Sequence, residues 1–107
     1  MHEESLRSPL VRRAIAAINQ GNLDNFMALF APDATVVDVS TYSGHEAIRA
    51  WAQRETFNVQ VRFRVAREKN KQGTIVEGNV QSVGGYSGPA TFSFTVDGDR
   101  IQRLVIE

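Results

Sequence analysis

The sequence predicts an α+β fold in which three helices come early in the chain and antiparallel strands complete it. Over residues 8–52, apolar side chains recur at spacings of three and four, with one β-branched run at 34–39. Over residues 59–106, apolar and polar side chains alternate, and turn sequences separate the alternating segments. Helices that are segregated from consecutive strands are typical of α+β proteins. The predicted order is α-α-β-α-β-β-β-β.

The first two helices have clear start and stop signals. Ser8 followed by Pro9 predicts the start of the first helix, and Gly21 predicts its end. Asn22 can cap a second, short helix that we expect to run to Pro32. Residues 1–7 are polar, and we expect them to be frayed. The buried face of the first helix is predicted to contain Leu10, Val11, Ala14, Ile15, Ala17 and Ile18.

A strand and a third helix follow. Residues 34–39 are rich in β-branched side chains and predict a strand. Ser43 and Glu46 have the spacing of a capping box, in which the serine side chain bonds the amide of residue 46. The third helix then presents Ala47, Ile48, Trp51 and Ala52 on one face.

Four strands are predicted in the second half of the chain. Period-two alternation covers residues 59–65, 74–81 and 91–96, and residues 101–106 are predicted to close the chain as a final strand. Turns are predicted at 69–73, at 84–89 and at Asp97-Gly98, a dipeptide typical of tight hairpins. Because the strands alternate, one sheet face is expected to be buried and the other to face water.

Composition narrows the classes of function. A chain of 107 residues fits one domain, residues 1–107. The 12 basic and 12 acidic side chains cancel, which argues against nucleic acid as a partner. There are no cysteines and only two distant histidines, so we predict neither a metal site nor a cofactor. The polar and acidic start of the chain lacks the features of a signal peptide. No apolar run is long enough to span a membrane. We therefore expect a cytoplasmic protein.

Several segments together resemble the nuclear transport factor 2-like superfamily, especially its SnoaL-like polyketide cyclase and ketosteroid isomerase branches. They are residues 19–24 (NQGNLD), 29–38 (LFAPDATVVD), 44–51 (GHEAIRAW) and 97–101 (DGDRI). The resemblance implies a curved sheet and helices that form a cone with a pocket at its open end. It also implies a homodimer through the outer sheet face. It says little about function, because this fold hosts many functions.

Asp38 is the main catalytic candidate. It interrupts an apolar strand, where a charge is costly unless it is solvated or paired. It also matches the position of the catalytic base in ketosteroid isomerases, which implies a general base. The alternative interpretation is a carboxylate at a strand end that binds a backbone amide or an arginine.

The resemblance to the isomerases fails at their proton donors. Ala14 and Phe92 stand near the positions where that enzyme offers hydrogen-bond donors to the developing oxyanion, and neither side chain can donate. Tyr42 and Tyr86 are predicted on loops, and nothing in the sequence brings them together. We therefore do not expect ketosteroid isomerase activity itself.

Other residues are candidates for lining the pocket. Trp51 can form an aromatic pocket surface or simply fill the core, and the same two interpretations apply to the other apolar candidates. His45 opens the third helix and can reach the pocket mouth, although a solvated side chain is the more common case. The candidate ligand-binding residues are Ala14, Ile18, Phe30, Trp51, Phe63, Phe92 and His45.

The only local concentration of basic residues lies between positions 62 and 71. We interpret it as a solvated sheet face and hairpin tip, in which Glu77 can pair with Arg62 or Arg64 across neighbouring strands. A site for an anionic ligand is the less favoured interpretation.

Two functions remain open from the sequence. The first is a domain that binds a small apolar molecule and acts as a cyclase, isomerase or hydratase through Asp38 on a carbonyl-bearing ligand. The second is a non-catalytic module for ligand binding or dimerisation, which the missing proton donors favour. The sequence does not decide whether the protein is an enzyme.

Overall fold

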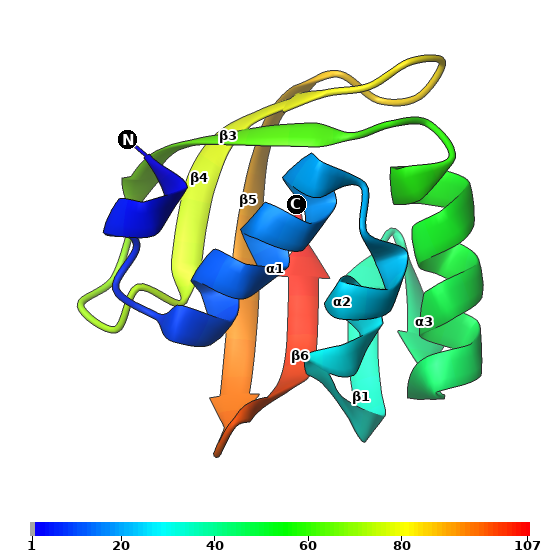
Figure 1. Cartoon of the computed structure of the whole chain (residues 1–107), viewed down its shortest axis with the longest axis horizontal. Helices are drawn as coiled ribbons and strands as arrows, with labels where there is room; N and C mark the ends of the chain where they lie inside the picture. The colour runs from blue at the N-terminus through cyan, green and yellow to red at the C-terminus, as the bar shows by residue number, and fades with distance from the viewer. Residues whose placement is uncertain (1) are drawn as a thin grey trace.

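Six strands form one curved, open sheet, and the helices pack against its inner face (Figure 1). The structure is a computed structural model that describes residues 2–107. The strand order is β2-β1-β6-β5-β4-β3. The elements are η1 (Glu3–Ser5), α1 (Pro9–Gln20), α2 (Leu23–Ala28), β1 (Phe30–Asp38), β2 (Ser40–Ser43), α3 (Gly44–Ala52), η2 (Gln53–Phe57), β3 (Arg62–Glu68), β4 (Ile75–Gln81), β5 (Gly88–Asp97) and β6 (Arg100–Ile106). The predicted α+β class is confirmed.

The sheet differs from the prediction in being mixed. β1 pairs with β6 in parallel, with Val36 opposite Leu104, and the short strand β2, which we did not predict, forms the edge beside β1. β1 also begins at residue 30 rather than 34, and α2 ends at residue 28 rather than 32. The amide of Ile101 donates to the carbonyl of Leu29 at 2.8 Å, which draws residues 29 and 30 into the sheet. This contact between distant segments ends the helix early.

The local signals at the ends of α1 and α2 act as predicted. The Ser8 hydroxyl oxygen accepts a hydrogen bond from the Val11 amide at 3.3 Å, and Pro9 occupies the first helical position. Gly21 ends α1 in the left-handed conformation, at φ 68°. The side chain of Asn22 then caps α2. These bonds satisfy backbone groups that a helix end leaves open.

One local prediction was wrong. The capping box of α3 does not form, because the Ser43 side chain makes no cap hydrogen bond. Of residues 1–7, which we expected to be frayed, residue 1 lies outside the described residues, and most of the others are exposed. Leu6 is only 2% exposed, and its carbonyl accepts a hydrogen bond from Arg12 at 2.8 Å. The burial of one apolar side chain fixes a segment that is otherwise polar.

The core lies between the inner sheet face and helices α1, α2 and α3. The inner-facing residues of the strands alternate with exposed ones, as the period-two pattern predicts. Phe63 of β3 and Phe92 of β5 stack across the strands with their ring centroids 4.4 Å apart. Ile15 of α1 is fully buried against this layer, which stabilises the fold by about 1.5–3 kcal/mol.

β3 bends over α1 at an irregularity in its pairing with β4. The register shifts between Val65 and Arg67, so that β3 carries one extra residue there. Gly78 of β4 lies opposite this bulge and is buried. A Cβ atom at Gly78 would overlap the carbonyl oxygen of Arg64 and lie 2.9 Å from the Cα of Val65. The close approach of the two backbones therefore requires glycine at position 78.

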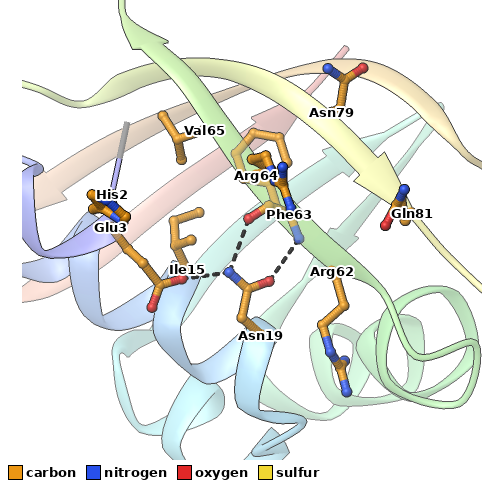
Figure 2. A pocket seen from close by; sticks show the side chains of 10 residues that line it. All are labelled: His2, Glu3, Ile15, Asn19, Arg62, Phe63, Arg64, Val65, Asn79 and Gln81. Carbon is orange, nitrogen blue, oxygen red and sulfur yellow. Dashed lines mark hydrogen bonds between the residues drawn. The ribbon is translucent and has the colours of Figure 1, made fainter.

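Hydrogen bonds from the Asn19 side chain connect α1 to the edge strand β3 (Figure 2). Its side-chain oxygen accepts a hydrogen bond from the Phe63 amide at 2.7 Å, and its side-chain nitrogen donates to the Phe63 carbonyl at 2.9 Å. The same nitrogen also donates to the Glu3 carboxylate. The amide group thus takes the place of a neighbouring strand at Phe63.

We expect Asn19→Ala to lower the free energy of unfolding by about 1–3 kcal/mol, because the Phe63 amide and carbonyl would lose their partner in a partly buried position. Urea unfolding followed by circular dichroism measures this change. Gln20→Ala, on the exposed side of the same helix, is the matched control and should change stability by less than about 0.5 kcal/mol. Equal effects of the two variants would contradict the role of Asn19.

Candidate functional site

A cavity of about 640 Å³ opens between the inner sheet face and α3; we call it the central cavity. Its volume is within the range of pockets that hold small molecules. Aliphatic and aromatic side chains form most of its surface, and a few polar side chains lie among them. The lining residues are Ile18, Phe26, Asp38, Val39, Ser40, Tyr42, Trp51, Glu55, Thr56, Val61, Val80, Tyr86, Pro89, Ala90, Phe92, Leu104, Ile106 and Glu107.

Asp38 is the last residue of β1 and is half-buried at this cavity. One of its carboxylate oxygens, Oδ2, accepts a hydrogen bond from the indole nitrogen of Trp51 on α3 at 3.0 Å. No ion pair joins Asp38 to another described residue, so its negative charge is balanced only by this neutral donor. The indole holds the carboxylate in one orientation and leaves Oδ1 available to a ligand.

A tight turn after Asp38 sets its position. Asp38 pairs with Ser40 across the hairpin of β1 and β2, and Val39 between them takes a left-handed conformation at φ 66°. A β-branched residue in that conformation is strained, at a cost of about 1–3 kcal/mol. Val39 is also fully exposed at the cavity mouth. Strain of this kind persists where the surrounding structure enforces it, here beside the candidate base.

Tyr42 brings a hydroxyl group to the same cavity. It lies on β2 opposite Val36, on the sheet face that also carries Asp38. Its phenol oxygen accepts a hydrogen bond from Arg54 at 3.2 Å, so the phenol hydrogen can be donated to a ligand. Arg54 also bonds Glu55 at 3.0 Å, and this hydrogen bond raises the pKa of Arg54.

Thr56 provides a second hydroxyl group. It lies in η2, the π-helical turn that continues α3, and is only 7% exposed. It lines the central cavity, so its hydroxyl is a candidate donor to a ligand there.

The structure brings together some of the predicted site residues and separates others. Asp38, Ile18, Trp51 and Phe92 line the central cavity. The remaining candidates lie elsewhere. Ala14 and Phe30 are packed in the core, 0% and 1% exposed, Phe63 lines a different pocket, and His45 is exposed at the start of α3.

His45 has a structural contact. One of its ring nitrogens lies 2.8 Å from the carbonyl oxygen of Phe30, so the ring can donate a hydrogen bond there in the appropriate tautomer. This bond joins the start of α3 to the start of β1. His45 does not belong to the lining of the central cavity.

Sequence reasoning missed the two hydroxyl donors. Tyr42 was predicted on a loop, because a strand of four residues, Ser40–Ser43, is too short for a clear period-two pattern. Thr56 stands in a polar segment, residues 53–56, that has no apolar periodicity. Only the pairing of β2 with β1 and the helical turn after α3 bring these hydroxyls to the cavity that Asp38 lines.

Two further features of the described residues bear on function. Residues 2–107 contain no group of three or more histidine, aspartate or glutamate side chains placed to hold a metal ion. In the same part of the chain, every helix is too short or too polar to cross a bilayer.

Comparison with known families identifies one clear match. The sequence pattern of the SnoaL-like domain matches residues 11–104, which is most of the chain. No protein with a curated description matches significantly.

Solved structures share the fold over nearly the whole chain. A candidate polyketide cyclase from Sinorhizobium meliloti is 25% identical, with a TM-score of 0.82 and 100% of both chains covered. A protein from Sphaerobacter thermophilus is 29% identical, with a TM-score of 0.74, covering 92% of this chain and 91% of the other. A candidate polyketide cyclase from Xanthomonas campestris is 22% identical, with a TM-score of 0.76 and coverage of 98% and 91%, and supports the fold alone.

Proposed function

Because this chain belongs to the SnoaL-like domain family, we propose that it binds a small, mostly apolar, carbonyl-bearing molecule in the central cavity and that Asp38 acts there as a general base. The observation that carries the proposal is the Asp38 carboxylate beside an apolar cavity, held by the Trp51 indole with one oxygen available. The reaction class is proton transfer next to a carbonyl group, as in isomerisation or cyclisation.

The proposed chemistry begins when Asp38 removes a proton from the carbon next to the ligand carbonyl. The C–H bond breaks, an O–H bond forms on the carboxyl group, and the electron pair moves into an enolate. The developing oxyanion needs hydrogen-bond donors. Tyr42 and Thr56 line the same cavity, and their hydroxyls can donate to this oxyanion. Return of the proton to another carbon of the ligand completes an isomerisation.

These donors revise one part of the sequence interpretation. Ala14 and Phe92 still cannot donate, so the arrangement in ketosteroid isomerases is not reproduced at those positions. The proposal uses donors from β2 and η2 instead. It therefore concerns carbonyl ligands in general and not steroids.

Benzylacetone, a small apolar ketone, tests the proposal. Trp51 is the only tryptophan of the chain and lines the cavity, so its fluorescence reports binding there. We expect saturable quenching of this fluorescence and, in D₂O, enzyme-dependent exchange of the protons next to the carbonyl, followed by NMR. Binding without exchange would support the alternative, a non-catalytic ligand-binding module. No binding of this or related ketones would contradict both.

We also propose that the protein forms a homodimer through the outer sheet face. The observation that favours this is an apolar strip across four strands. Val37 of β1 pairs with Val105 of β6, Val105 with Ser93 of β5, and Ser93 with Ile75 of β4. The three apolar side chains are only partly buried, and a second copy could cover them.

We expect Val105→Lys to convert the dimer to a monomer, because a charge at the centre of the strip would have to be buried without a partner. Sedimentation equilibrium at high micromolar concentration measures the mass. Gln20→Lys, at an exposed position of α1 away from the outer sheet face, is the control and should keep the dimer. A monomeric wild-type protein would contradict the proposed dimer.

A further inference from the structure

A second pocket lies along the edge strand β3, on the side of the molecule shown in Figure 2; we call it the β3 groove. Its volume is about 750 Å³. It extends from the N-terminal segment and α1 to β3 and β4. The lining residues are His2, Glu3, Ile15, Asn19, Arg62, Phe63, Arg64, Val65, Asn79 and Gln81.

The two arginines of the groove have no carboxylate partner among the described residues. We expected Glu77 to pair with Arg62 or Arg64, but it bonds Arg67 at 3.1 Å and Lys69 at 3.4 Å instead. The bulge after Val65 explains this, because it moves Arg67 opposite Glu77 in the register. The positive charges of Arg62 and Arg64 therefore remain available.

Glu3 does not neutralise these arginines. Its carboxylate accepts the hydrogen bond from Asn19, and no ion pair joins it to another described residue. Among the described residues, the two arginines make a single side-chain hydrogen bond, from Arg62 to the neighbouring Val61 carbonyl at 2.9 Å. With His2 neutral, the groove carries one net positive charge.

Amide side chains face the arginines across the sheet. Asn79 pairs with Arg64 and Gln81 pairs with Arg62 in the register of β3 and β4, and cross-strand partners project on the same face. Two guanidinium groups and two amides thus lie together. Guanidinium groups bind carboxylate and phosphate oxygens through paired hydrogen bonds, and neutral amides add further donors without adding negative charge.

The groove is separate from the central cavity. Ile15, Phe63 and Val65 close it on the α1 side, but they are buried, 0%, 2% and 3% exposed, and the two β3 residues point to the opposite sheet face from Arg62 and Arg64. Phe63 lines the groove while Phe92, stacked on it, lines the central cavity. One aromatic layer therefore divides the two pockets, and a ligand in one does not occupy the other. Ile75, the β4 residue of the proposed dimer strip, lies at the opposite end of β4 from Asn79 and Gln81.

We propose that the β3 groove is a second ligand site, which binds a small organic anion. The carboxylate or phosphate group of the ligand contacts Arg62 and Arg64, with Asn79 and Gln81 as additional donors. Its apolar part packs on the aliphatic stems of the two arginines. This site is independent of the function proposed for Asp38.

Calorimetric titration with four probes tests the site at low salt. We expect phenyl phosphate and phenylacetate to bind, inorganic phosphate to bind at least about tenfold more weakly, and neutral benzyl alcohol not to bind. Raising the salt to about 0.5 M should weaken binding of the anions, because it screens exposed charges. We expect the probes not to quench Trp51 fluorescence, since they do not enter the central cavity.

Variants link the binding to the groove. Arg62→Gln with Arg64→Gln should weaken binding of phenyl phosphate at least tenfold, and Arg64→Gln alone should weaken it by a smaller factor. Arg13→Gln, an exposed arginine on α1 outside the groove, is the matched control and should leave the affinity unchanged. The proposal is overturned if neither organic anion binds, if the double variant binds as tightly as wild type, or if inorganic phosphate binds equally well. None of these outcomes depends on proton exchange by Asp38.

Discussion

Asp38→Asn is expected to reduce proton exchange on a bound ketone by a factor of about 10²–10⁴, the usual contribution of a positioned general base. The amide is nearly the same size as the carboxylate and can still accept a hydrogen bond from Trp51. It cannot take up a proton from carbon near neutral pH. We therefore expect ketone binding, measured by Trp51 fluorescence, to change little while exchange, measured by NMR in D₂O, is nearly lost.

A matched control separates this effect from a general loss of negative charge. Asp97→Asn changes an exposed carboxylate at the turn between β5 and β6 and keeps a sequence that favours the same turn, Asn-Gly. Exchange by this variant should equal that of wild type. If Asp38→Asn also retains full exchange, Asp38 is not the base, and the ligand-binding module becomes the better description.

Gly78→Ala is expected to lower the free energy of unfolding by about 3 kcal/mol, at the upper end of the usual cost of overpacking. The added methyl group would overlap the Arg64 carbonyl oxygen and approach the Cα of Val65 to 2.9 Å. Both neighbours are backbone atoms of a paired strand, so they cannot rotate away. Relief requires β3 and β4 to separate where the sheet bends over α1.

Thermal unfolding followed by circular dichroism measures this effect. For a chain of this size, a loss of 3 kcal/mol lowers the Tm by more than about 10 °C. Asn79→Ala, the next residue on β4 and exposed, should change the Tm by no more than a few degrees. A variant at position 78 that is as stable as wild type would mean that the two strands can move apart at little cost.

The helix ends and strand faces could be predicted because they depend on neighbours in the sequence. The side chains of Ser8 and Asn22 accept hydrogen bonds from amides three residues later, and Gly21 ends α1 in the left-handed conformation. Each of these effects acts within one helical turn. The alternation in β3, β4 and β5 follows from the pleat of a strand, which directs successive side chains to opposite faces. Asp97-Gly98 forms its turn between paired neighbours. Only the serine cap of α3 failed among these local signals.

The candidate site was predictable in part. Asp38 could be singled out as a charge at the end of an apolar strand, and Trp51 as an aromatic residue on a buried helix face. Their mutual hydrogen bond joins residues 13 positions apart on different elements, so no local pattern encodes it. The same limit applies to Tyr42 and Thr56, whose hydroxyls reach the cavity only after β2 and η2 are in place.

The sequence by itself determined the α+β class, the start of each of the first two helices and the buried faces of the strands. Tertiary structure alone decided the parallel pairing of β1 with β6, the early end of α2 and the bulge opposite Gly78. That bulge then decided which cations Glu77 neutralises and left Arg62 and Arg64 free of ion pairs with described residues. Local signals act through hydrogen bonds within one turn or one pleat. A register, a cavity and an ion pair between strands depend on segments that become neighbours only when the chain has folded.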